Sequence, residues 1–184
     1  MKLQITYFLF LSFSNEIAAE GFVAWYYPTI NEGKPVSSGY VNNNKTYQAA
    51  SHPPADICIN GLAVATPEEW DKLLEQQRFT KVNQGKGKPV VRYNVETYDV
   101  HVLNSNYTFA APEELIKKYN KNSGVRMVML VTVSGTVQFG ADKSSPKQHF
   151  HDVFTLVPNW EVIARAGSKA TRRYIICSQN YRAY

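Results

Sequence analysis

The chain has 184 residues, which suits a single domain that can bury a core without covalent staples. Its 20 basic and 15 acidic residues give a formal charge of +5. This mild excess is compatible with RNA or acidic partners, but it excludes the dense basic patch of a dedicated nucleic-acid module. Two cysteines, Cys58 and Cys177, build no disulfide framework and lack zinc-site spacing, so a reducing compartment is expected.

The N-terminal segment leaves a second localisation open. Residues 1–14 combine one lysine with an apolar run, which is similar to a secretory signal, and Asn44 and Asn106 begin glycosylation-type triplets. The run has no tidy small-residue cleavage site and is too short to span a membrane as a helix. We therefore expect residues 1–15 to be an extension or a helix packed on the body, with a secreted ligand-binding domain as an alternative.

A helix and a hairpin are expected first along the chain. Ser14 gives a helix start signal, and apolar positions continue at helical spacing to Ile30, with a kink or a second segment expected at Pro28. The dipeptide Asn60-Gly61 between apolar runs predicts a two-residue hairpin.

The middle of the chain predicts two further helices around a long strand. Thr66 is a cap, Pro67 suits the first helical position and Glu69 completes a capping box. Clean alternation predicts a strand over residues 90–103, and a short helix begins at Pro112.

Three strand-like runs complete the chain, the last of them ending at the final residue. They start at Val125, Lys147 and Arg172 and are separated by turn signals. The order of elements favours an α+β domain in which helices cover one face of an antiparallel sheet.

The second of these runs contains two candidate chemical sites. His149 and His151 share one face, but a metal ion would need a further ligand such as Asp99 or His101, so a solvated or partner-covered face is the favoured interpretation. Asp152 lies on the other face between phenylalanines, where burial would raise its pKa. An isomerase or dehydratase using this base would also need an enclosed pocket with a donor.

Basic residues in two loops are candidate contacts with RNA or a ribosomal surface. No aromatic residues that could stack on bases are interleaved with them, so solvated loop charge is the simpler interpretation. These candidates are Lys86, Lys88, Lys117, Lys118 and Lys121.

Four segments, in this order and spacing, resemble the nuclear transport factor 2-like superfamily. More narrowly, they resemble the small subunit of the messenger RNA export receptor, in fungi the mRNA transport regulator. The matching segments are an aromatic helix with Phe22, Val23, Tyr26 and Tyr27, residues 57–77, a strand with Val133, Gly135, Val137 and Phe139, and the two last strands, residues 149–158 and 174–184.

The resemblance implies a cone-like curved sheet wrapped on helices over residues 16–184, with no catalytic activity, cofactor, metal or membrane association. It implies a heterodimer, formed by sheet faces, with the similar domain of a larger export subunit. That heterodimer carries messenger RNA, and in fungi also ribosomal subunits, through nuclear pores. Shuttling between nucleus, pore and cytoplasm follows, with nucleoporin contacts made directly or through the partner.

The last strand supplies the predicted partner interface. Unless a bulge intervenes, alternation places six residues on one face, and their mixture of tyrosine, arginine and isoleucine is typical of interfaces. The resemblance implies that Arg182 pairs with an acidic residue of the larger subunit. The predicted interface residues are Tyr174, Ile176, Ser178, Asn180, Arg182 and Tyr184.

Overall fold

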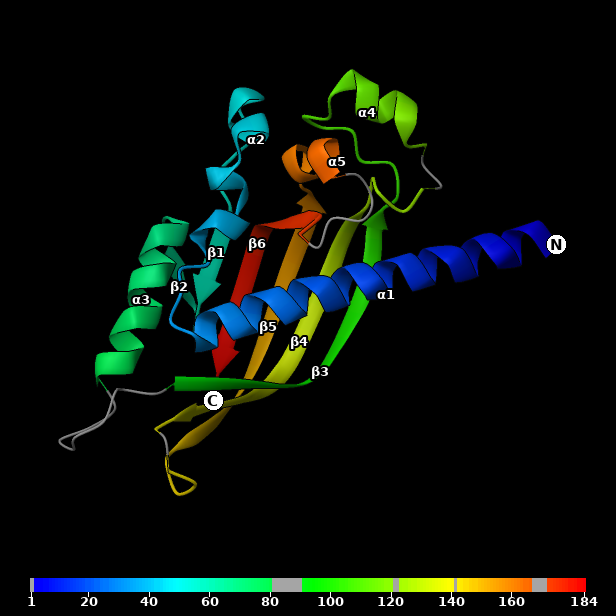
Figure 1. Cartoon of the computed structure of the whole chain (residues 1–184). Coiled ribbons are helices and arrows are strands. Elements are labelled where there is room, and N and C mark those ends of the chain that lie inside the picture. Colours follow the sequence, from blue (N-terminus) through cyan, green and yellow to red (C-terminus); the bar gives the residue numbers. More distant parts are fainter. Residues whose placement is uncertain (1, 81–90, 121–122, 141, 167–171) are drawn as a thin grey trace.

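One long helix lies across a six-stranded sheet in this protein (Figure 1). The computed structural model describes residues 2–80, 91–120, 123–140, 142–166 and 172–184, with side chains from residue 16 onward other than 79–80. The helices are α1 (Lys2–Asn31), α2 (Lys45–Ala49), α3 (Pro67–Thr80), α4 (Glu113–Lys118) and α5 (Trp160–Ala166). The strands are β1 (Asp56–Ile59), β2 (Leu62–Val64), β3 (Val91–Asn104), β4 (Val128–Phe139), β5 (Lys147–Pro158) and β6 (Tyr174–Ala183).

The sheet has the strand order β2-β1-β6-β5-β4-β3. Helix α1 covers one face and α2, α4 and α5 gather at one end, which confirms the α+β class (Figure 1). All neighbouring strands pair antiparallel except β1 and β6, which run parallel, so the prediction of a wholly antiparallel sheet is wrong at this pair. The alternation of apolar and polar residues shows which face of a strand is buried. The same alternation occurs beside a parallel or an antiparallel neighbour, so it does not predict strand direction.

Bulges and one glycine allow the sheet to curl around α1. Glu96 and Leu103 are extra residues on β3 where the register with β4 shifts, and such bulges bend a strand. On β4, a Cβ added at Gly135 would overlap the backbone oxygen of Asn94 and lie 2.9 Å from the ring of Phe150. Only glycine permits this close approach of β3 to β4.

Helix α1 starts earlier than the sequence predicts. It runs from Lys2, not Ser14, because the residues before Ser14 include neither proline nor glycine to stop it. It also continues through Pro28 to Asn31. In the described part of the chain, no helix combines the length and apolar character needed to cross a membrane.

The predicted hairpin and the predicted helix cap are both confirmed. Asn60 (φ 52°) and Gly61 (φ 85°) form the turn between β1 and β2 in the left-handed conformation that such turns require. The hydroxyl of Thr66 accepts the amide of Glu69 at 3.2 Å, and the carboxylate of Glu69 accepts the amide of Ala65 at 3.0 Å. The first bond satisfies an amide that the first turn of α3 leaves free, and the second holds Ala65, the residue before the cap.

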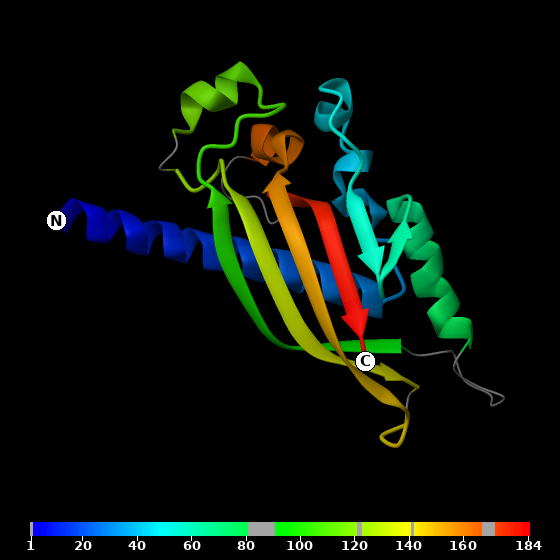
Figure 2. The same cartoon turned by 180° about the vertical axis from the view of Figure 1, so that it is seen from behind.

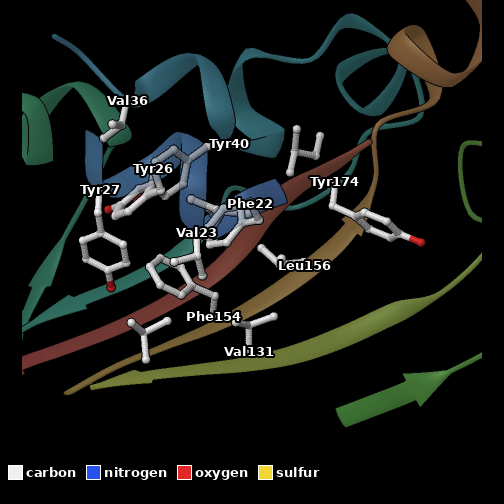
Figure 3. Packing of buried hydrophobic residues seen from close by; sticks show 14 of the residues in the cluster. Phe22, Val23, Tyr26, Tyr27, Val36, Tyr40, Val131, Phe154, Leu156 and Tyr174 are labelled. Carbon is white, nitrogen blue, oxygen red and sulfur yellow. The ribbon is translucent and has the colours of Figure 1, made fainter. Parts of the chain in front are cut away.

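The core lies between α1 and the concave face of the sheet (Figure 3). Phe22 and Tyr26 of α1 meet the ring of Phe154 edge-on, with centroids 4.9 and 5.0 Å apart. All three side chains are buried, so this contact joins the helix firmly to the centre of β5.

Candidate functional site

The face of the sheet that points away from α1 is not crossed by any described element (Figure 2). We call it the outer face. Its residues alternate with buried core residues along each strand, and the strand register places them side by side. They are Thr97, Asp99 and His101 of β3, Leu130, Thr132, Ser134 and Thr136 of β4, His149, His151, Val153 and Thr155 of β5, and Ser178, Asn180, Arg182 and Tyr184 at the β6 end.

Small hydroxyl and β-branched side chains make up about half of the outer face, and they occupy much of its centre on β4 and β5. The outward-facing residues of β4 are half-buried, because side chains of the neighbouring strands β3 and β5 flank them. Ser134, His151 and Arg182 occupy successive positions across β4, β5 and β6, and the hydroxyl of Ser134 lies 2.9 Å from Nδ1 of His151. An outer face of short side chains, open to solvent, is suited to packing against another sheet.

The predicted interface set is wrong for Tyr174 and Ile176. Ile176 pairs with Leu156 and Ser178 with Thr155, so Cys177 is an extra residue, a bulge that reverses the alternation. Tyr174 and Ile176 therefore point into the core, where both are buried. The other four, Ser178, Asn180, Arg182 and Tyr184, do share the outer face, and their role in partner binding stays a prediction.

The terminal residues are held in the sheet as expected. The backbone amide and carbonyl of Tyr184 bond to those of His149 at 2.9 and 3.0 Å, while the side chain of Tyr184 is 74% exposed. Arg182 is also exposed and forms no ion pair with any described residue. The outer face thus presents the guanidinium of Arg182, which has no ion-pair partner among the described residues, beside the exposed ring of Tyr184, whose centroid lies 6.3 Å from that of His149.

The predicted RNA-contacting lysines are only partly described. Lys86, Lys88 and Lys121 lie outside the described residues. On α4, Lys117 approaches Glu113 at 3.6 Å and Lys118 lies 5.2 Å from the centre of the Tyr119 ring. Their contact with RNA remains a prediction.

A second group of polar residues lies on the inner side of the sheet. It consists of six buried side chains that bond to one another, and we call it the buried cluster: Tyr26, Tyr27, Tyr40, Trp70, Asp152 and Gln179. The amide nitrogen of Gln179 donates to the carboxylate of Asp152 at 2.9 Å and to the hydroxyl of Tyr26 at 2.9 Å. The hydroxyl of Tyr27 donates to Asp152 at 3.2 Å.

Burial raises the pKa of Asp152 to about 7, and the bonds from Gln179 and Tyr27 offset only part of this effect. The predicted raised pKa is therefore confirmed. An isomerase would also need an enclosed pocket at this carboxyl. The cavity of about 380 Å³ beside Trp70 and Tyr181 and the cavity of about 450 Å³ beside Asp71 and Arg78 are both lined by other residues.

The secreted-domain and metal-site hypotheses gain no support from the geometry. Asn44, which begins one glycosylation-type triplet, is buried, bonds to Asn159 at 3.1 Å and caps α2. Cys58 and Cys177 are free thiols, as expected. Within the described residues, no three histidine, cysteine or acidic side chains are grouped to hold a metal ion.

Sequence reasoning missed Gln179 as a site residue because alternation with Ser178 and Asn180 places it on the inner face but gives no sign of its contact with Asp152. Tyr27 was noted only as part of the aromatic helix, and its partner Asp152 lies 125 positions further along the chain. Alternation alone gives no signal for such a long-range polar contact.

Comparison with protein-family models finds no match, and comparison with the curated proteins finds none either. Solved structures do match. A structure of Mtr2 is 52% identical, with 93% of this chain and 99% of that chain covered and a TM-score of 0.86. A chain of a Sac3N peptide complex with Mex67:Mtr2 is 56% identical (TM-score 0.84), and a chain of the Chaetomium thermophilum Mex67 NTF2-like domain in complex with Mtr2 is 55% identical (TM-score 0.83), each with the same two coverages.

These matches run over nearly the whole of both chains, so they bear on the entire domain and confirm the nuclear transport factor 2-like fold. Sequence identities of 52–56% are high enough to show membership of a family and not only a shared fold. The chain belongs to the Mtr2 family, whose members are the small subunits of the messenger RNA export receptor.

Proposed function

We propose that this chain is the non-catalytic half of a heterodimer that carries messenger RNA through nuclear pores. Its outer face packs against the NTF2-like domain of a Mex67-type large subunit. The observation that carries this proposal is the outer face itself, which spans strands β3 to β6 and is uncovered by any described element (Figure 2). Related chains in complex with Mex67 support it.

Charge on the outer face supports a partner with an acidic residue near its rim. Arg182 has no ion-pair partner among the described residues, and it lies beside His151 in the register. An uncompensated cation at this position favours an opposite charge across an interface. Arginine and tyrosine are the residues that most often supply binding energy at interfaces, so Arg182 and Tyr184 are its expected anchors.

The position of Asp152 supports the absence of catalysis in this proposal. This carboxyl is enclosed by aromatic rings and lines neither of the two cavities. A general base must lie within hydrogen-bonding reach of a substrate. The buried cluster therefore serves the fold and not a reaction.

Nucleoporin contacts belong to the heterodimer as a whole, directly or through the partner, and the related assembly that binds a Sac3N peptide supports this. Shuttling between nucleus, pore and cytoplasm follows from this role. Ribosomal subunits are a second cargo, and weak RNA contacts fall to Lys117, Lys118 and the loop lysines.

Co-expression with the NTF2-like domain of the large subunit tests the proposal. Light scattering should give the mass of a 1:1 complex, and Thr132→Arg at the centre of the outer face should abolish it. The matched control is Ala24→Arg on the solvent side of α1, which adds the same charge and should leave the complex intact. A complex that survives Thr132→Arg would exclude the outer face as the interface.

A further inference from the structure

The outer face is organised in rows that run across the strands, because each outward-facing residue lies opposite one residue of the next strand. One row contains Ser134 of β4, His151 of β5 and Arg182 of β6, and we call these three residues the donor row. Residues directly opposite each other on antiparallel strands have Cβ atoms about 4.5–5.5 Å apart. The side chains of His151 and Arg182, both exposed, therefore start close together on the partner face.

The imidazole of His151 is oriented by Ser134, whose hydroxyl lies 2.9 Å from Nδ1. Among the described residues, none bonds to the other ring nitrogen, Nε2. A protonated imidazole donates through both of its nitrogens, whereas a hydroxyl oxygen can accept. In the protonated form, Nδ1 therefore donates to the oxygen of Ser134, and Nε2 is available as a donor to a second molecule.

The donor row forms no ion pair with a described acidic residue. Asp99 lies on β3 in the neighbouring row and approaches the imidazole of His101 at 3.4 Å. Asp56 lies on β1 opposite Ser178, in a different row from Arg182. The described part of the chain thus provides a guanidinium and an imidazole side by side, and it provides no carboxylate to pair with them.

We propose that His151 and Arg182 together bind one carboxylate of the large subunit, and that Ser134 positions the imidazole for this contact. This inference rests on the proposed function of the outer face. An ionised carboxylate has two oxygens and about four acceptor sites, so it can accept from a guanidinium on one side and an imidazole on the other. An amide or a basic group at the same place would leave the two donors unpaired or repelled, which makes His151 a determinant of specificity.

Binding of the carboxylate is linked to protonation of His151. The charged and titratable groups that face its imidazole are Arg182 directly opposite, His149 on the same face of β5 and Tyr184 diagonally across on β6, while β4 contributes hydroxyl groups. A positive imidazole beside a guanidinium is disfavoured until an anion lies between them. The complex therefore binds more protons than the separate subunits, and by reciprocity the affinity rises as the pH falls.

The test is the dissociation constant of the heterodimer between about pH 8 and about pH 6, a range that brackets the ordinary titration of histidine. For the native chain we expect the constant to fall roughly three- to tenfold from the higher pH to the lower. His151→Gln keeps a hydrogen-bonding side chain without a titrating ring, so it should lose this slope. His149→Gln is the matched control on the same strand and face, opposite Tyr184, and it should keep the slope.

The positioning role of Ser134 has its own pair of variants. Ser134→Ala should bind more weakly with a smaller slope, because the ring loses its fixed orientation, and Ser134→Thr, which keeps the hydroxyl, should restore both. A native affinity without pH dependence, a slope that persists in His151→Gln, a slope that is lost in His149→Gln, or unchanged binding by Ser134→Ala would each overturn this inference. The failure of any complex to form at any pH would instead overturn the proposed function.

Discussion

The side-chain groups that donate hydrogen bonds to the buried carboxyl of Asp152 are neutral: the hydroxyl of Tyr27 and the amide of Gln179. In the unfolded chain it ionises with its ordinary pKa of 3.8, whereas burial raises the pKa in the folded chain to about 7. Between these two values the folded state binds more protons than the unfolded state. The contribution of Asp152 to stability is therefore complete below about pH 4 and is lost as the pH rises through about 7.

We expect this loss in the free energy of unfolding measured with urea at a series of pH values. At about 1.4 kcal/mol for each unit, the shift predicts a difference of a few kcal/mol between about pH 5 and about pH 8. Asp152→Asn should be flat over this window apart from what the other titrating groups contribute. An equal loss of stability in the variant would assign the pH dependence to groups other than Asp152.

Single residues on the outer face were predictable where alternation was unbroken. Arg182 and Tyr184 come after the Cys177 bulge, and their exposure agrees with the pattern. Tyr174 and Ile176 come before it and were assigned to the wrong face. A bulge is set by the pairing of β6 with β5, which no local sequence signal reports.

At the scale of elements, the local signals were reliable and the long-range ones were not. The Asn60-Gly61 turn and the Thr66 cap act within a few residues, so the sequence alone predicts them. The parallel pairing of β1 with β6 joins residues more than 100 positions apart, and it depends on how the chain returns to the sheet. The early start of α1 reflects the absence of a stop signal, which alternation and cap patterns do not register.

The close approach of β3 to β4 at Gly135 predicts that a larger residue there destabilises the protein. Gly135→Ala should destabilise the protein by about 1–3 kcal/mol or more, because the new methyl group overlaps the backbone of Asn94 and the strands must separate. Gly61→Ala is the control, since a methyl group there meets nothing within 4 Å. It should lose only the roughly 1–2 kcal/mol that the left-handed conformation costs an alanine.

Urea denaturation of both variants measures this difference. The expected order places Gly135→Ala below Gly61→Ala in unfolding free energy. The reverse order would mean that β3 and β4 tolerate a wider spacing than the structure indicates.

At the scale of the whole molecule, the proposed start of the domain lies where the described side chains of α1, those from residue 16 onward, become buried. Ala18 and Ala19 are the first buried side chains of the described part of α1, and Phe22 and Tyr26 follow. We propose that residues 16–184 form the nuclear transport factor 2-like domain and that residues 1–15 are an extension of it. A chain that starts at Glu16 should keep its unfolding free energy within about 0.5 kcal/mol, as surface changes usually do.

Circular dichroism and urea denaturation of the shortened chain are sufficient to check this. Loss of cooperative unfolding would place the domain boundary inside residues 1–15. The same preparation should bind the large subunit with unchanged affinity, because the outer face lies on the opposite side of the sheet from α1 (Figure 2).

The central claim is that the outer face binds the large subunit, and a substitution of Arg182 tests this claim most directly. The measurement is the dissociation constant for the NTF2-like domain of the large subunit with Arg182→Glu, beside Lys72→Glu, which makes the same charge reversal on exposed α3. We expect Arg182→Glu to weaken binding by about 2–5 kcal/mol, because it loses an ion pair and adds a repulsion. Lys72→Glu should bind like the native chain. Equal affinity of the two variants would contradict the assignment of the partner interface to this face.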